Sequence, residues 1–259
     1  MPRFSANISM LFLEHKFLDR FQAAKDAGFG AIEVQFPYDI EPADLLAAKE
    51  NANVEIAVIN IGAGDLTSGG PGLAAMPGRE DQFKEAVEQA CQYAEVLKPE
   101  NMNVLPGWPP MDQFSREECL DVLASNLHLA ADALAPAGAK ALVEAVNTPD
   151  RPGFLLHTSA QAIATIEAAD HENLAIEYDL YHMQIMEGNL VNRMSEILDQ
   201  IGHIQFADTP GRGEPGTGEI NYPFVFEAID KMGWQGWLGA EYVPTRPTSE
   251  TLDWLQPHI

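Results

Sequence analysis

Cysteine and basic side chains are scarce in this chain of 259 residues. Its two cysteines, Cys91 and Cys119, exclude a disulfide framework and a CxxC metal site. Only 15 lysines and arginines face 39 acidic residues, which gives a formal net charge of −24 at pH 7. Such a charge repels nucleic acid and anionic membranes, so we expect neither as a partner. A small anionic substrate would need a local positive group.

Long apolar runs and several common motifs are also missing. The N-terminal run ISMLFL (8–13) is too short for a signal peptide, and no stretch could span a bilayer, which predicts a cytoplasmic protein. The chain contains no HExxH, GxSxG or GxxxxGK[ST] motif. The glycines of IGAGDLTSGG (61–70) lack the spacing of a dinucleotide loop, so we expect no nucleotide cofactor.

What the sequence does contain is one repeated unit: a short apolar run, a loop, an amphipathic segment, and then a Gly or Pro. This alternation predicts parallel strands covered by helices, and eight such units in about 250 residues match a closed (β/α)₈ barrel. A doubly wound open sheet is the alternative, but no GxGxxG follows the first run. With no linker-like composition, residues 1–259 are expected to form a single domain. The eight predicted strands are FSANISM (4–10), AIEVQF (31–36), EIAVINI (55–61), NMNVLPG (101–107), KALVEAV (140–146), LAIEYDL (174–180), HIQFAD (203–208) and GWLGAEY (236–242).

Helical periodicity marks the segments between these runs, because apolar residues recur there every three or four positions. The longest connection without a clear pattern is 62–78, which follows the third strand. A loop of this length after a barrel strand predicts a lid over an active site, or else an inert surface loop. The periodic sets are Leu13, Phe17, Phe21 and Ala24; Leu120, Leu123, Leu127, Ala130 and Leu134; and Val225, Ile229 and Met232.

Oxygen-bearing side chains occur near the ends of the last four predicted strands: Glu144, Asp179, Gln205 and Glu241. In a barrel these ends form one face, where active sites lie. Three crowded carboxylates repel one another unless a cation lies among them, and oxygen ligands without thiolate favour Mg²⁺ or Mn²⁺. The alternative is that each is a strand-end polar residue hydrogen-bonded to loop amides.

Other polar residues are close to this face in sequence. His182 lies three residues beyond Asp179, where it can face the same site. Arg212, in TPGRGEPGTGEINY, is either an anion clamp or a solvated loop charge. Glu33 and Glu177 lie within strands, with Glu177 expected to point inward but lower in the barrel. His203 is expected to open its strand at the opposite end and to be structural.

The segments around these residues resemble the hydroxypyruvate isomerase family, within the xylose isomerase-like barrels. The resemblance extends over essentially the whole chain. It implies that Glu144, Asp179, Gln205 and Glu241 bind the metal and that Glu144 and Glu241 are the acid/base pair. By similarity to related sugar epimerases, His182 and Arg212 contact substrate. The similar segments are PRFSANISMLF, GLAAMPGRE, LVEAVN, YDLYHMQ, HIQFADTPGRGEPGTGEINYP and GWLGAEY.

The resemblance implies an aldose–ketose isomerase that interconverts hydroxypyruvate and tartronate semialdehyde through an enediolate, with Mg²⁺ or Mn²⁺ bound. A 2-oxo-tetronate isomerase with the same site is the nearest alternative. A non-catalytic sugar-acid binding barrel is more remote. The apurinic endonuclease branch is disfavoured, because it needs a histidine-rich zinc cluster and a basic face. By analogy, a homodimer or homotetramer is expected.

Overall fold

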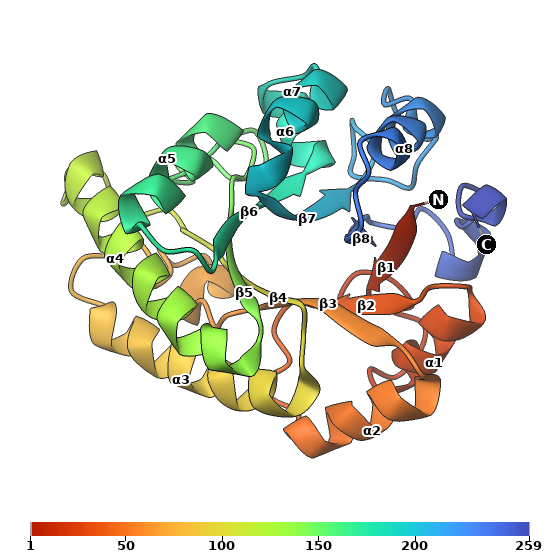
Figure 1. The fold of residues 1–259 in the computed structure, drawn as a ribbon, viewed down its shortest axis with the longest axis horizontal. Coiled ribbons are helices and arrows are strands. Elements are labelled where there is room, and N and C mark those ends of the chain that lie inside the picture. Colours follow the sequence, from red (N-terminus) through yellow and green to blue (C-terminus); the bar gives the residue numbers. More distant parts are fainter. Residues whose placement is uncertain (1, 259) are drawn as a thin grey trace.

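The computed structural model describes residues 2–258, and its centre is a closed barrel of eight parallel strands (Figure 1). Each strand pairs with its neighbours in chain order, and β1 closes the ring by pairing with β8. The predicted (β/α)₈ fold is therefore confirmed, and the open doubly wound sheet is excluded. The strands are β1 (Arg3–Asn7), β2 (Ala31–Val34), β3 (Glu55–Asn60), β4 (Asn101–Val104), β5 (Lys140–Glu144), β6 (Leu174–Asp179), β7 (Ile201–Phe206) and β8 (Trp237–Ala240).

Helices surround this ring on the outside (Figure 1). Short 3₁₀ helices occupy Gly64–Ser68, Ala135–Ala137, Leu198–Gln200, Thr248–Glu250 and Gln256–His258. The α-helices are α1 (Asp19–Asp26), α2 (Pro42–Ala52), α3 (Glu80–Leu97), α4 (Arg116–Leu134), α5 (Ser159–Ala169), α6 (Leu180–Met186), α7 (Leu190–Ile197) and α8 (Tyr222–Lys231).

Helix α4 follows directly from its sequence. Ser115 and Glu118 form a reciprocal capping box at its start, which satisfies two backbone N–H groups that have no partner within the helix. Four of its predicted apolar positions are buried against the barrel, and Leu120 is half-buried. The periodic pattern therefore predicted this helix and its buried face correctly.

The first helix begins later than its apolar spacing predicted. Helix α1 starts at Asp19, and Leu13 is 55% exposed, so the predicted apolar position at Leu13 is wrong. The chain turns at Phe12, which has a positive φ of 60° and donates its backbone N–H to the Thr248 hydroxyl over 2.7 Å. This turn leaves the next residue outside the core.

The predicted strands were too long at their carboxyl ends. Strand β8 ends at Ala240, so Glu241 lies just beyond it, although its N–H still donates to the Phe206 carbonyl at 3.1 Å. Strand β7 begins at Ile201, two residues before the predicted start. The prediction that His203 opens this strand is therefore wrong, because His203 is its third residue.

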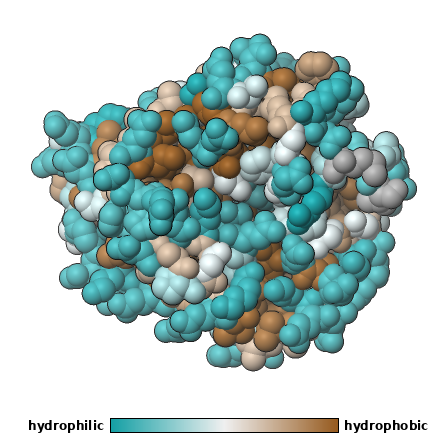
Figure 2. Space-filling view, viewed as in Figure 1, coloured by the Kyte–Doolittle hydropathy of each residue, from teal (hydrophilic) through white to brown (hydrophobic). Residues whose placement is uncertain are grey.

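The outer surface in the view of Figure 2 is mainly hydrophilic, with apolar residues gathered in separate patches. This agrees with the large acidic excess of the chain. Within residues 2–258, every helix is too short or too polar to cross a membrane.

Candidate active site

The four predicted metal-binding residues lie at the carboxyl ends of their strands. Glu144 and Asp179 are the last residues of β5 and β6, Gln205 is next to last in β7, and Glu241 follows β8. All four side chains are buried, and Asp179 pairs in register with Gln205. The strand order therefore places these oxygen-bearing groups at one end of the barrel.

Burial and the crowding of like charges raise the pKa values of the three carboxylic acids. Burial, with the charges of Glu241 and Asp179, raises the pKa of Glu144 well above its usual range. Burial raises the pKa of Asp179 to about 7, although the Arg212 charge opposes the rise. Burial also raises the pKa of Glu241 against the opposing effect of Arg212. The ionised form of each group is therefore disfavoured here, and a cation among the carboxylates would stabilise it.

The donor set fits a hard divalent cation. Carboxylate oxygens of Glu144 and Asp179 lie within 4.8 Å of each other and of a ring nitrogen of His182. Beside them, the Oε1 atom of Gln205 is buried and has no hydrogen-bond partner among residues 2–258. An uncompensated buried carbonyl oxygen costs free energy unless something binds it, and oxygen is the ligand atom that Mg²⁺ and Mn²⁺ prefer.

Arg212 lies against two of these carboxylates. Its Nη2 atom contacts Glu241 Oε2 closely and lies 3.5 Å from Asp179 Oδ2. Its backbone has a positive φ of 55°, a costly conformation for a residue with a side chain, and its carbonyl accepts a hydrogen bond from Val243 N at 2.7 Å. The sequence left open an anion clamp or a solvated charge. The solvated charge is wrong, because the guanidinium pairs with the acidic cluster at the wall of the cavity, while contact with an anion stays a prediction.

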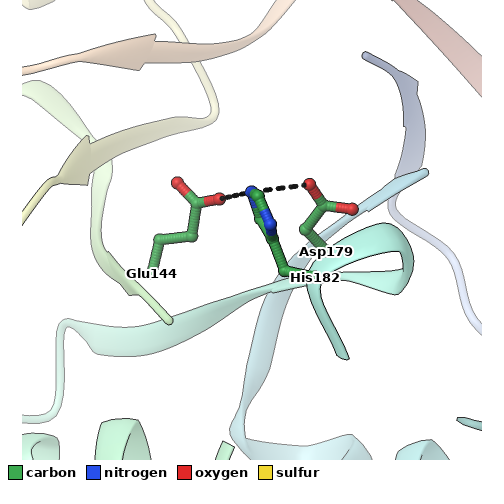
Figure 3. A group of neighbouring side chains, drawn as sticks. All are labelled: Glu144, Asp179 and His182. Carbon is green, nitrogen blue, oxygen red and sulfur yellow. Dashed lines mark ion pairs between the residues drawn. The ribbon is translucent and has the colours of Figure 1, made fainter. Parts of the chain in front are cut away.

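His182 lies between Glu144 and Asp179, as Figure 3 shows. Its Nε2 atom is 3.6 Å from Glu144 Oε1 and 3.4 Å from Asp179 Oδ2. On the other side of the ring, the amide nitrogen of Asn147 approaches Nδ1 at 2.7 Å. Burial, with the charges of Arg212 and Arg151, lowers the pKa of His182 well below its usual range, so the ring is neutral.

The contacts of Asn147 define the tautomer of this histidine. The Oδ1 atom of Asn147 accepts from the backbone N–H of Asp150 at 2.8 Å, so its NH₂ group must face His182 and the Asp150 carboxylate. Nδ1 of His182 therefore accepts, and Nε2 carries the proton. A protonated Nε2 is a hydrogen-bond donor directed into the acidic cluster rather than a metal ligand.

Three amide side chains that the sequence did not single out hold the two glutamates. Oε1 of Glu241 accepts from Asn7 Nδ2 at 2.9 Å and from Gln35 Nε2 at 2.8 Å. Oε2 of Glu144 accepts from Asn103 Nδ2 at 3.1 Å. These amides come from β1, from the residue after β2, and from β4. The strand-end criterion used for the last four strands would have found them in the first four.

A second polar layer lies inside the barrel next to the ligand set. Glu33 accepts hydrogen bonds from Ser5 and His203, so His203 is structural as predicted. Burial acts to raise the pKa of Glu33, but the His203 charge and the hydrogen bonds together lower it. Glu177 is also buried, and burial with the charges of Glu144 and Glu33 raises its pKa well above the usual range. Neither glutamate is among the residues that line the cavity.

The cavity above the carboxylates has a volume of about 310 Å³. Leu66, Thr67 and Gly69 from the 62–78 loop form part of its wall, together with Trp108 and Phe154. The loop therefore borders the site, as the lid prediction requires, while closure stays a prediction. Arg151 also lines the cavity; sequence reasoning missed it because it lies seven residues beyond Glu144, in the loop after β5.

Comparison with known proteins agrees with this architecture. Residues 21–258 match the family model described as xylose isomerase-like TIM barrel. The hydroxypyruvate isomerase of Escherichia coli is 43% identical over all of both chains. The 2-oxo-tetronate isomerase of Cupriavidus necator is 41% identical over 100% of this chain and 99% of its own.

A crystal structure from Brucella melitensis, described as an AP endonuclease of family 2, superimposes with a TM-score of 0.96 at 36% identity. The match covers 100% of this chain and 99% of that one. The chain therefore belongs to the hydroxypyruvate isomerase family of xylose isomerase-like TIM barrels and is an isomerase of that family.

Proposed function

We propose that this protein is a metal-assisted aldose–ketose isomerase that interconverts hydroxypyruvate and tartronate semialdehyde. The observation that carries the proposal is that the carboxylates of Glu144, Asp179 and Glu241 lie close enough to interact, at the end of the barrel where the Gln205 oxygen has no partner within residues 2–258. Glu144 and Glu241 also line a cavity of small-molecule size. The substrates named for the Escherichia coli and Cupriavidus necator relatives support a short hydroxy-keto acid.

Glu144, Asp179, Gln205 and Glu241 would hold Mg²⁺ or Mn²⁺. A bound ion of this kind stabilises negative charge that develops on substrate oxygens. Arg212 contacts Glu241 and Asp179, so it and a metal ion compete for the same two carboxylates. Its positive charge stabilises these carboxylates. Because Arg212 also lines the cavity, we expect it to contact an anionic substrate there.

Glu144 and Glu241 are the proposed acid/base pair. One glutamate removes a proton from C3 of hydroxypyruvate, which gives an enediolate, and the other delivers a proton to C2. The hydroxyl proton moves from O3 to O2, so the product is an isomer and needs no redox cofactor. His182 Nε2–H is placed to donate to a substrate oxygen while the charge develops. Asn7, Gln35 and Asn103 fix the two carboxylates in place.

The carboxylate end of the substrate needs a positive partner in a cavity bordered by acidic groups. Arg151 lines this cavity, and within residues 2–258 its guanidinium donates a single long hydrogen bond of 3.4 Å, to the Asp150 carbonyl. A guanidinium binds a carboxylate through two parallel N–H donors. We assign Arg151 to the substrate carboxylate.

A 2-oxo-tetronate isomerase remains the second candidate because of the cavity size. One water molecule occupies roughly 30 Å³ in the liquid. A cavity of about 310 Å³ therefore accommodates a four-carbon acid as readily as a three-carbon acid. The Cupriavidus necator relative, named for that substrate, is nearly as similar as the Escherichia coli relative.

The test is turnover of both acids by the purified protein with Mg²⁺ or Mn²⁺, together with metal analysis. We expect isomerisation of at least one acid and loss of activity with EDTA. Glu144→Gln and Glu241→Gln should each lower kcat by roughly 10²- to 10⁴-fold, the usual contribution of a positioned acid or base. Asp112→Asn, an exposed carboxylate outside the cavity lining, is the control and should keep full activity.

No turnover of either acid with metal present would refute the isomerase assignment. Unchanged turnover in either Glu→Gln variant would refute the acid/base roles alone.

A further inference from the structure

We infer that Glu33 is a positioning residue that fixes which end of the Gln205 side-chain amide, the oxygen or the NH₂ group, points at the proposed metal site. The inference depends on the proposed function, because it concerns how the fourth ligand of that site is oriented. Glu33 does not line the cavity, so its role is indirect.

The contact that carries the inference is one hydrogen bond inside the barrel. Gln205 Nε2 donates to Glu33 Oε2 over 2.8 Å, and both side chains are buried. Glu33 Oε1 is occupied by Ser5 Oγ at 2.6 Å and His203 Nε2 at 2.8 Å. Ser5 and His203 therefore hold one oxygen of the Glu33 carboxylate, and Gln205 donates to the other.

The chemistry of the two groups makes this contact directional. A carboxylate only accepts hydrogen bonds, whereas an amide has an NH₂ end that donates and an oxygen end that accepts. Glu33 therefore requires the NH₂ end of Gln205, which leaves Oε1 on the other side of the amide. That oxygen is one of six buried side-chain atoms that have no hydrogen-bond partner among residues 2–258. Without Glu33, the amide could present either end to a cation, and an NH₂ group cannot bind one.

Glycine at position 239 of β8 makes room for this arrangement. A Cβ atom added at Gly239 would lie 1.9 Å from Glu33 Oε1 and 2.7 Å from its carboxyl carbon. Gly239 also pairs in register with Gln205 on β7, so it lies next to both members of the Glu33–Gln205 hydrogen bond. Gly239→Ala should therefore displace the Glu33 carboxylate from Gln205 without touching a ligand itself.

An exchange of groups tests the inference. In Glu33→Gln, two amides face each other and can pair in either sense, so the orientation of Gln205 is no longer fixed. In Gln205→Glu, two buried carboxylates face each other and repel. In the double variant Glu33→Gln/Gln205→Glu, the new carboxylate again requires an NH₂ group opposite it and again leaves one oxygen toward the site.

Two measurements follow on the full-length protein. Thermal unfolding without metal should show lower melting temperatures for both single variants and recovery in the double variant. Calorimetric titration with Mn²⁺ should show affinity weakened roughly 10- to 100-fold in Glu33→Gln, the usual effect of losing a partner of a metal ligand. The double variant should regain most of that loss. Gly239→Ala should weaken Mn²⁺ binding in the same range, while Gly62→Ala, whose added Cβ would meet its nearest atom at 3.4 Å, should not.

Equal Mn²⁺ affinity in Glu33→Gln and the parent protein would overturn the inference, as would a double variant no better than the single one. Should Glu33→Gln not fold, the double variant and Gly239→Ala still decide the question. A parent protein that binds neither Mn²⁺ nor Mg²⁺ would instead refute the proposed metal site, and the unfolding series would still report whether positions 33 and 205 are paired.

Discussion

Single residues in this site owe their properties to neighbours on other strands. The buried Glu241 carboxylate pairs with the Arg212 guanidinium and accepts hydrogen bonds from the amides of Asn7 and Gln35. Both amides lie more than 200 positions earlier in the sequence. Burial and the nearby arginine charges keep His182 neutral, and its proton lies on Nε2 because Asn147, in a different loop, donates to Nδ1. The identities of the acidic residues could be predicted from the sequence. The amide partners that fix their orientation were not predicted, because the strand-end criterion was applied only to the last four strands, whereas these amides lie on or just after β1, β2 and β4.

The role of Arg151 gives a prediction at this scale. Arg151→Gln removes the guanidinium assigned to the substrate carboxylate, so KM should rise and kcat/KM should fall by roughly 10- to 100-fold, as expected for a lost charged hydrogen bond. The melting temperature should hardly change, because the side chain is exposed and makes one long hydrogen bond in the part of the chain that the structure describes.

Arg246→Gln is the matched control for Arg151, because it removes the same charge from a side chain that is 54% exposed and outside the cavity lining. Steady-state kinetics of both variants on the better substrate check the assignment. Equal KM values for Arg151→Gln and Arg246→Gln would contradict it.

At the scale of elements, the strands of the barrel could be predicted, but the residues at which strands and helices begin and end could not. Each of the eight apolar runs became a strand, because a strand buried on both faces leaves a continuous apolar signature. The runs extended past the observed strand ends, since the first loop residues at the active face are also buried or half-buried. The first helix was predicted to begin too early, because the turn at Phe12 depends on a hydrogen bond with Thr248, more than 200 residues away.

The 62–78 loop supports a prediction about the cavity wall. Asp65 Oδ1 accepts from Arg79 Nη1 at 2.9 Å and from Gly72 N at 3.1 Å, which closes the loop on itself beside the residues that border the cavity. Asp65→Asn removes the ion pair and should raise KM severalfold. The free energy of unfolding should fall by less than about 1 kcal/mol, because both partners are partly exposed.

Limited proteolysis should locate faster cleavage of Asp65→Asn within residues 62–78. Asp112→Asn changes the net charge equally in another exposed loop and should match the parent protein in both assays. A KM unchanged by Asp65→Asn would show that the anchored loop does not shape the substrate site.

At the scale of the whole molecule, net charge distinguishes a small-molecule isomerase from a DNA-binding endonuclease among barrels of the same fold. The Brucella melitensis structure is described as an AP endonuclease, and its fold is nearly the same as this one. A DNA-binding protein gains most of its affinity by neutralising phosphates with lysine and arginine. This chain has 15 such residues against 39 acidic ones, and Arg212 is engaged with two carboxylates of its own site.

We therefore expect no binding to duplex DNA that carries an abasic-site analogue, even at low ionic strength, where phosphate contacts are strongest. Fluorescence anisotropy should stay flat up to protein concentrations of about 10⁻⁴ M, the weak limit of ordinary non-specific binding. The duplex should also remain uncut with Mg²⁺, Mn²⁺ or Zn²⁺ present. A saturable rise in anisotropy that weakens as salt is added, or metal-dependent cleavage at the abasic site, would contradict this expectation. Because the negative charge is spread over the whole chain, no single substitution of an acidic residue should create such binding.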